Sequence, residues 1–76
     1  MKEENIKILQ YYIDSIKNIE FNKDEIYNLI KKNHMMLIRC ALTGRTKGVS
    51  LIDTIIVLGK ERTLKRLSDA IMLLQK

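Results

Sequence analysis

Apolar residues at the start of the chain recur every three or four positions, with polar residues between them. The members of this stripe are Ile6, Leu9, Ile13 and Ile16, flanked by Tyr12 and Ile19. Side chains at that spacing lie on one face of an α-helix. The pattern therefore predicts a first helix of about four turns, which breaks at Phe21-Asn22-Lys23.

Two further helices are predicted in the middle of the chain. Asn22 can cap the first of them, because Glu25 lies three residues later and can complete a capping box with it. The apolar positions of this helix are Ile26, Leu29 and Ile30. The next helix covers Met35 to Thr43, and Gly44 is placed to end it in the left-handed conformation.

The last part of the chain predicts a loop and two more helices. Residues 45–49 have no apolar period, which indicates a loop. Ser50 begins a second capping box with Asp53, ahead of a short helix over Leu51–Leu58. Gly59 ends that helix, and the final helix runs from Lys60 to about Gln75. The buried stripe of the final helix comprises Leu64, Leu67, Ile71 and Leu74.

Five helices and no strand pattern predict an all-α fold, a compact bundle of about five short helices. A chain of 76 residues can build one marginal core but no second domain, so residues 1–76 are expected to form a single helical domain. The predicted core comprises Ile6, Leu9, Ile13, Ile16, Ile26, Leu29, Ile30, Ile38, Leu42, Ile55, Leu58, Leu64, Leu67, Ile71 and Leu74.

Composition restricts the cellular compartment in which the chain is expected and the kinds of site that it can form. No apolar run approaches the roughly 20 residues that span a bilayer, and the first residues lack the apolar segment of a secretory leader. The single cysteine, Cys40, excludes an intramolecular disulfide, and one cysteine with one histidine gives too few ligands for a Cys/His zinc site. We expect a cytoplasmic protein, or one in an organelle interior of similar redox state.

Charge is distributed unevenly along the chain. Residues 1–30 carry four Lys and six Asp/Glu, a net charge of −2, whereas residues 31–76 carry ten Lys/Arg and three Asp/Glu, a net charge of +7. A basic half on a small domain indicates an anionic partner, with nucleic acid as the first candidate. The alternative is a basic face that only keeps the protein in solution.

The sequence contains no complete catalytic or phosphate-binding motif. Gly59-Lys60 matches half of a phosphate-binding P-loop, but Thr54 stands where the first glycine is needed and Glu61 where Ser or Thr must meet magnesium. His34 has no nucleophile or orienting partner in the pattern and is expected to be a surface or half-buried side chain. We therefore predict no catalytic residue, no cofactor and no metal.

The sulfur-containing residues are expected to fill the core. Cys40 lies between Ile38 and Leu42 in an apolar run, which favours a buried position. Met35-Met36 and Met72 stand at helical spacings and are predicted to be adaptable core side chains.

Two separated blocks carry a resemblance to a known family. The first is Arg39-Cys40-Ala41-Leu42-Thr43-Gly44, and the second is Leu58-Gly59-Lys60-Glu61-Arg62. Together, at this spacing, they resemble the C-terminal anticodon-binding subdomain of bacterial-type glutamyl-tRNA synthetases. In that family an Arg-x-Ala-Leu-Thr-Gly element precedes a loop and a short helix, and a Leu-Gly-Lys-Glu-Arg junction leads into the last helix. The resemblance is strongest over residues 22–74.

The resemblance implies an RNA-binding site and its partner. The implied partner is the anticodon stem-loop of a tRNA, glutamate-specific in this family, since exposed loops with cations and hydroxyls suit splayed RNA bases. The implied RNA-binding residues are Arg39, Gly44, Arg45, Thr46, Lys47, Gly48, Leu51, Arg62, Lys65 and Arg66.

Simpler interpretations stay open for several of these residues. Arg39 can be a helix-surface residue paired with a carboxylate, Lys47 a solvated loop cation, and Leu51 the first core contact of its helix. Arg62, Lys65 and Arg66 form a basic face, in which Glu61 and Lys65 are an expected favourable pair.

The chain also departs from the family. Leu37 and Val49 replace prolines that are common there, which predicts a less preorganised loop. The resembled enzymes are several times longer and carry their ATP-binding signatures elsewhere. This chain is therefore expected to be either a domain excised from a synthetase, with the rest of that enzyme as its partner, or a free-standing relative. In both cases we expect no aminoacylation by the chain itself.

Two other functions compete with RNA binding. One is a protein–protein docking module on a synthetase or another partner. The other is a membrane-surface helix over residues 2–19, but the acidic side chains Glu3, Glu4 and Asp14 on its polar face weaken attraction to anionic lipid. We expect no membrane partner.

Overall fold

The computed structural model describes residues 2–44 and 50–75. Its elements are five α-helices and one 3₁₀ turn, with no strand among the described residues. They are α1 (Lys2–Asn18), α2 (Lys23–Leu29), η1 (Lys32–His34), α3 (Met35–Thr43), α4 (Leu51–Leu58) and α5 (Lys60–Leu74). The predicted all-α bundle of five short helices is confirmed, whereas the 3₁₀ turn was not predicted.

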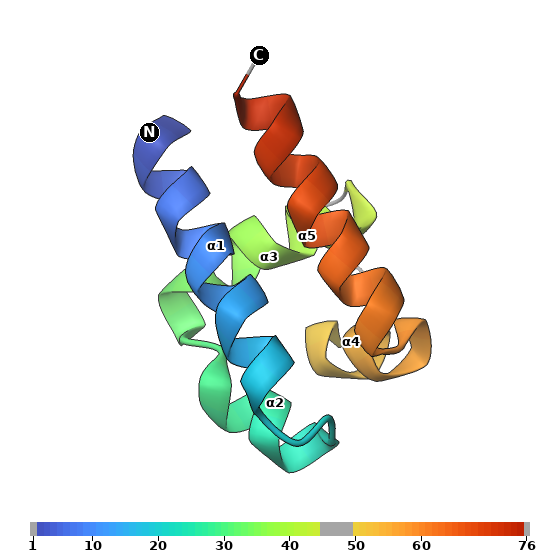
Figure 1. Ribbon diagram of the computed structural model, residues 1–76. Helices are drawn as coiled ribbons and strands as arrows, with labels where there is room; N and C mark the ends of the chain where they lie inside the picture. The colour runs from blue at the N-terminus through green and yellow to red at the C-terminus, as the bar shows by residue number, and fades with distance from the viewer. Residues whose placement is uncertain (1, 45–49, 76) are drawn as a thin grey trace.

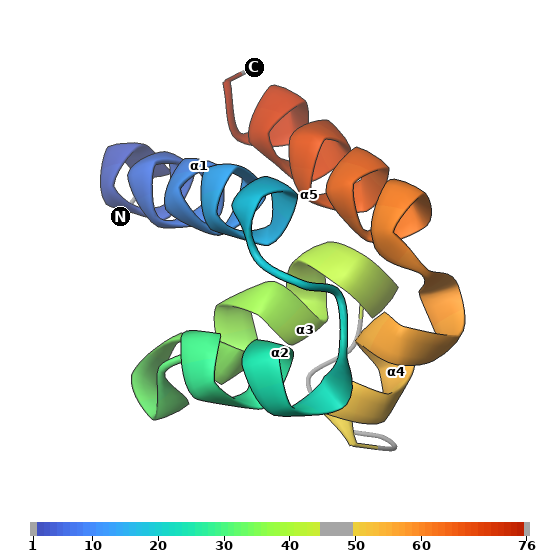
Figure 2. The same cartoon turned by 60° about the horizontal axis from the view of Figure 1, so that its bottom comes forward.

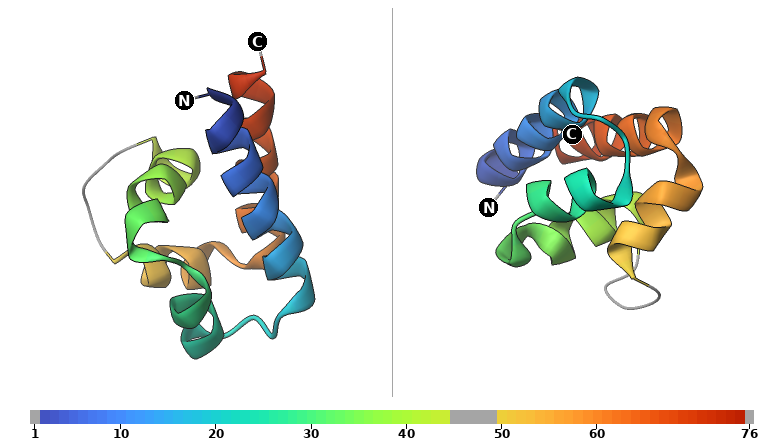
Figure 3. Two further views of the ribbon diagram at one scale, coloured as in Figure 1. Left: turned by 90° about the vertical axis from the view of Figure 1, so that its left-hand side faces the viewer. Right: turned by 90° about the horizontal axis from the view of Figure 1, so that it is seen from below.

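The helices form two layers. The first helix α1 and the last helix α5 run side by side and share the largest interhelical contact. Helices α2, α3 and α4 lie together on one side of this pair, as the turned views show (Figures 2 and 3). Helix α5 also contacts α3 and α4, so it joins the two layers.

The core lies between the two layers. Ten of the fifteen predicted core residues are buried, and the other five (Ile6, Leu29, Leu58, Leu64 and Leu74) are partly buried against them. Tyr12, Leu51, Ile52 and Thr63 are buried in addition. The hydroxyl of the buried Thr63 donates a hydrogen bond to the carbonyl of Ile55 at 3.5 Å, so this polar side chain has a partner in the core.

The predicted burial of three sulfur-containing residues was wrong. Cys40 is exposed, because a helical step of two residues turns about 200° and therefore points it away from the buried Ile38 and Leu42. Met36 is 66% exposed and Met72 60% exposed, since each is out of phase with the buried stripe of its helix. Met35 is partly buried against the core, as predicted.

The glycine terminators act as predicted. Gly44 has φ 72° and ψ 9°, the left-handed conformation, and its N–H donates to the carbonyl of Cys40 at 2.8 Å. Gly59 has φ 85° and separates α4 from α5. Positive φ favours glycine because a side chain would crowd the backbone.

The predicted capping boxes are formed only in part. The side-chain oxygen of Asn22 accepts from the Glu25 N–H at 2.9 Å, as predicted, but the Asn22 N–H donates to the carbonyl of Glu20 at 3.0 Å instead of to the Glu25 side chain. The prediction of a second capping box, between Ser50 and Asp53, was wrong. The Ser50 side chain makes no capping hydrogen bond.

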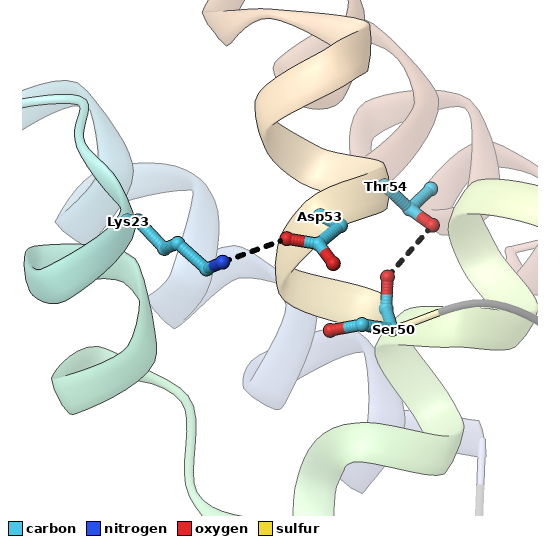
Figure 4. A network of polar contacts seen from close by, with 4 residues as sticks. All are labelled: Lys23, Ser50, Asp53 and Thr54. Atoms are coloured by element: carbon cyan, nitrogen blue, oxygen red, sulfur yellow. Dashed lines mark hydrogen bonds and ion pairs between the residues drawn. The ribbon is translucent and has the colours of Figure 1, made fainter.

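Ser50 and Asp53 have other contacts (Figure 4). The Ser50 carbonyl accepts from the Thr54 N–H at 2.9 Å and from the Thr54 hydroxyl at 3.0 Å. Asp53 pairs with Lys23 on α2 at 3.1 Å, so the carboxylate joins α4 to α2.

Candidate nucleic-acid interface

The C-terminal end of α3 is held by contacts from within the helix and from α5. Within α3, the Thr43 hydroxyl donates to the carbonyl of Arg39 at 2.8 Å, one turn earlier. From α5, the Arg66 Nη1 donates to the carbonyl of Leu42 at 2.7 Å. The last carbonyls of a helix lack partners within it, and a cation near them is favoured by the helix dipole. The Arg66 guanidinium therefore gives the Leu42 carbonyl a hydrogen-bond partner and stabilises the negative end of the helix dipole.

A basic face on α5 adjoins the end of α3. Arg62, Lys65 and Arg66 are exposed and, with Asp69, line an open depression on the surface. Arg66 and Asp69 also line a second depression, which the last residues of α3 complete from Cys40 to Gly44. The cationic surface of α5 is thus continuous with the end of α3.

Asp69 is a member of this surface that the sequence analysis missed. Its spacing of four residues from Lys65 and three from Arg66 was the available signal, because such positions are neighbours on a helix. The expected pair between Glu61 and Lys65, both of them described, does not come within ion-pair distance. Lys65 is therefore exposed and does not form the predicted ion pair with Glu61.

The other predicted RNA-binding residues differ in their surroundings. Arg39 is half-buried on α3, one turn before Thr43. Leu51 is only 3% exposed and belongs to the core, which favours the packing interpretation of this residue. Arg45, Thr46, Lys47 and Gly48 lie outside the described residues.

His34 has a structural partner. The buried hydroxyl of Tyr12 lies 2.7 Å from the Nδ1 of His34 and accepts from the Lys31 N–H at 3.1 Å. The histidine is half-buried, as predicted, and its ring meets the Tyr12 ring edge-on. This cluster fixes the segment around η1 to α1, on a different part of the molecule from the basic face.

Neither a metal-binding group nor a membrane span emerges from the described part of the chain. In residues 2–44 and 50–75, no three His, Cys, Asp or Glu side chains come together as metal ligands. Over the same residues, no helix is long and apolar enough to cross a bilayer.

Comparison with known proteins identifies the family. The family model described as "Anticodon binding domain" matches residues 1–71. The chain belongs to this family. The match confirms the resemblance found in the two sequence blocks, and it places the chain among the tRNA anticodon-binding domains of protein biosynthesis.

Individual relatives of this anticodon-binding domain are ligases. Glutamate–tRNA ligase 2 of Thermoanaerobacter pseudethanolicus is 35% identical over 99% of the chain and 18% of the ligase. Glutamate–tRNA ligase 2 of Thermosipho melanesiensis is 40% identical over 92% of the chain and 15% of the ligase. Glutamate–tRNA ligase 1 of Caldicellulosiruptor saccharolyticus is 56% identical over 47% of the chain and 7% of the ligase.

The anticodon-binding domain spans less than a fifth of the length of these ligases. By its family it corresponds to a tRNA-binding part of such a ligase and not to a catalytic part. No solved structure matches the chain.

Proposed function

We propose that this domain binds the anticodon stem-loop of a glutamate-accepting tRNA and carries out no chemistry itself. It acts as one unit over residues 1–76, as the tRNA-reading part of a glutamate–tRNA ligase, in the cytoplasm or an equivalent organelle interior. The observation that carries the proposal is the basic face of Arg62, Lys65 and Arg66 beside the end of α3, in a chain of the anticodon-binding family.

The two kinds of contact in such a complex have different roles. Cations of the basic face neutralise phosphates, which adds affinity for any RNA but no sequence information. Base discrimination falls to Arg39 and to the segment from Gly44 through Gly48, whose cations and hydroxyls suit the edges of unpaired bases. Leu51 supports this segment by anchoring the start of α4 in the core.

Binding of the isolated domain is expected to be weak and salt-sensitive. A net charge of +7 beyond residue 30 supplies the long-range attraction, and each phosphate contact adds about 0.7 to the salt slope on single strands. Contacts made by the rest of a ligase are absent, so the expected Kd is micromolar or weaker, on the order of 10⁻⁶ M or above.

A titration with two RNAs tests the proposal. The anticodon stem-loop of a glutamate tRNA is compared with the same stem carrying a scrambled loop, by fluorescence anisotropy at two salt concentrations. Arg39→Ala is expected to reduce the preference for the cognate loop by about 1–3 kcal/mol. Lys65→Ala is expected to weaken both RNAs equally.

Lys7→Ala is the matched control. Lys7 is exposed on α1, in the acidic half of the chain, so its removal changes the net charge as much as Lys65→Ala without touching the basic face. Equal binding of both loops by the wild-type domain would refute anticodon recognition. A salt-independent response would favour the protein-docking function instead.

A further inference from the structure

We infer that Arg66 is a positioning residue for anticodon recognition. It holds the C-terminal end of α3 through the Leu42 carbonyl, and so fixes the direction in which the chain leaves α3 at Gly44. The inference has two halves. The RNA half, that Arg66 affects anticodon recognition, rests on the proposed function. The structural half, that Arg66 holds the end of α3, rests on the protein structure alone.

The hydrogen bond is anchored at both ends by the core. Leu42, whose carbonyl accepts it, is 1% exposed, and Leu67, the residue after Arg66, is 0% exposed. The two partners are 24 residues apart in sequence and come from different layers of the fold. Because both backbones are held in place by buried side chains, the contact fixes one helix end relative to the other helix.

The chemistry of the contact makes it stronger than a neutral hydrogen bond. The donor is a charged guanidinium at 2.7 Å from the carbonyl oxygen, and the hydrogen bond is partly shielded from solvent. Charge-assisted hydrogen bonds are short and roughly twice as strong as neutral ones. Leu42 is the second-to-last residue of α3, so its carbonyl has no partner within the helix and needs one from outside.

Gly44 is the point at which this contact affects recognition. Its left-handed conformation and its hydrogen bond to the Cys40 carbonyl end α3 within two residues of Leu42. A shift of this end of α3 moves Arg39 and Gly44, to which the proposed function assigns contacts with the bases. A displacement of about 1 Å is enough to spoil a positioned contact.

Lys65 provides a matched comparison within the same helix turn. It is adjacent to Arg66, is exposed, and lines the same depression with Arg62. Lys65 and Arg66 carry the same charge, but only Arg66 bonds to α3. If the basic face acted through charge alone, replacing either residue would have the same effect.

The experiment compares Arg66→Met with Lys65→Met. Methionine keeps an apolar stem of similar size and removes both the charge and the donors. Amide hydrogen exchange is measured first, without RNA. Arg66→Met is expected to speed exchange at the Gly44 N–H by about tenfold or more while core amides of α1 stay protected, and Lys65→Met is expected to leave Gly44 unchanged. If Arg66→Met is not folded by circular dichroism, Arg66→Ala and Lys65→Ala replace the two variants in every assay.

RNA titration then tests recognition. Both variants are expected to lower the salt slope equally, because each loses one charge. Only Arg66→Met is expected to reduce the cognate-to-scrambled affinity ratio, by about tenfold. Equal ratios in the two variants would overturn the inference and leave the proposed function intact.

The remaining outcomes are also decisive. Faster exchange throughout the core of Arg66→Met would mean general destabilisation, not positioning, and would overturn the inference. If the wild-type domain binds both loops equally, the proposed function fails together with the RNA half. An unchanged Gly44 exchange rate would then overturn the structural half as well.

Discussion

Removing one buried hydroxyl tests how the segment around η1 is held on α1. Tyr12→Phe keeps the ring and its edge-on contact with His34, which has a centroid distance of 5.6 Å, and deletes only the oxygen. That oxygen accepts from the Lys31 N–H at 3.1 Å and lies 2.7 Å from the Nδ1 of His34. Which of the two atoms donates depends on the tautomer of His34, and Tyr12→Phe removes the hydrogen bond in either case.

The expected loss follows from these two hydrogen bonds. Each contributes about 0.5–1.5 kcal/mol net, so their joint loss lowers the free energy of unfolding by about 1–3 kcal/mol. Tyr12 is 0% exposed, which excludes water from its side of the contact, whereas Lys31 is exposed and His34 half-buried. Water reaching those two groups draws the value toward the lower end. A chain of this length has about 4–11 kcal/mol in total, so the change is large.

Urea denaturation followed by circular dichroism measures the effect. With an m-value of about 1 kcal/mol/M, the midpoint falls by about 1–3 M and the slope stays constant. Tyr11→Phe is the matched control, because Tyr11 is the adjacent residue and is 52% exposed. Its stability is expected to stay within about 0.5 kcal/mol of the wild type. Equal midpoints for the two variants would refute the assigned role of the Tyr12 hydroxyl.

Three further changes have expected outcomes in the same denaturation assay. Leu67→Ala opens a cavity at a residue that is 0% exposed and is expected to cost about 2–5 kcal/mol; a variant as stable as the wild type would contradict the core assignment. Gly44→Ala meets no atom within 4 Å of the added Cβ, so its expected cost of about 1–2 kcal/mol comes from positive φ alone, and an increase in stability would contradict it. Lys23→Ala breaks an ion pair whose side chains are 69% and 55% exposed, and it is expected to cost less than about 1 kcal/mol at low salt and less still at high salt.

Local signals in the sequence were sufficient for the helices. The bounds Met35–Thr43 and Leu51–Leu58 agree with the structure, because Gly44 and Gly59 mark chain positions that only glycine adopts easily. Apolar spacing of three and four residues located the buried face of α1 and α5 correctly. An apolar run placed Cys40 in the core and helical spacing placed Met36 there, but neither argument took account of the phase of the helix, and each residue lies two residues from the buried Ile38.

Contacts between distant segments could not be predicted in this way. The Tyr12–His34 pair is 22 residues apart and the Arg66–Leu42 pair 24 apart. Each depends on where two helices meet, which periodicity along one helix does not determine. The carboxylate of Asp53 illustrates the same limit: local spacing assigned it to a capping box with Ser50, but a lysine on another helix, Lys23, lies close enough to pair with it.

For the candidate interface, the sequence predicted which residues carry charge but not how they are used. Arg62, Lys65 and Arg66 are exposed on one helix as their spacing indicated. Their division into a surface cation, Lys65, and a helix-end ligand, Arg66, follows only from the packing of α5 against α3. Leu51 was assigned to RNA with core packing as the alternative, and its burial depends on the tertiary position of α4.

The contact between α1 and α5 also bears on how the molecule folds. The largest interface in the bundle joins its first helix to its last, so closing it brings together chain segments separated by most of the sequence. Loop-closure entropy opposes such an encounter, and chains rich in distant contacts fold more slowly than helical bundles built from neighbours. During synthesis, α1 leaves the ribosome long before α5 exists and cannot bury its apolar face on its main partner. The packing of α1 is therefore completed late, when α5 has emerged.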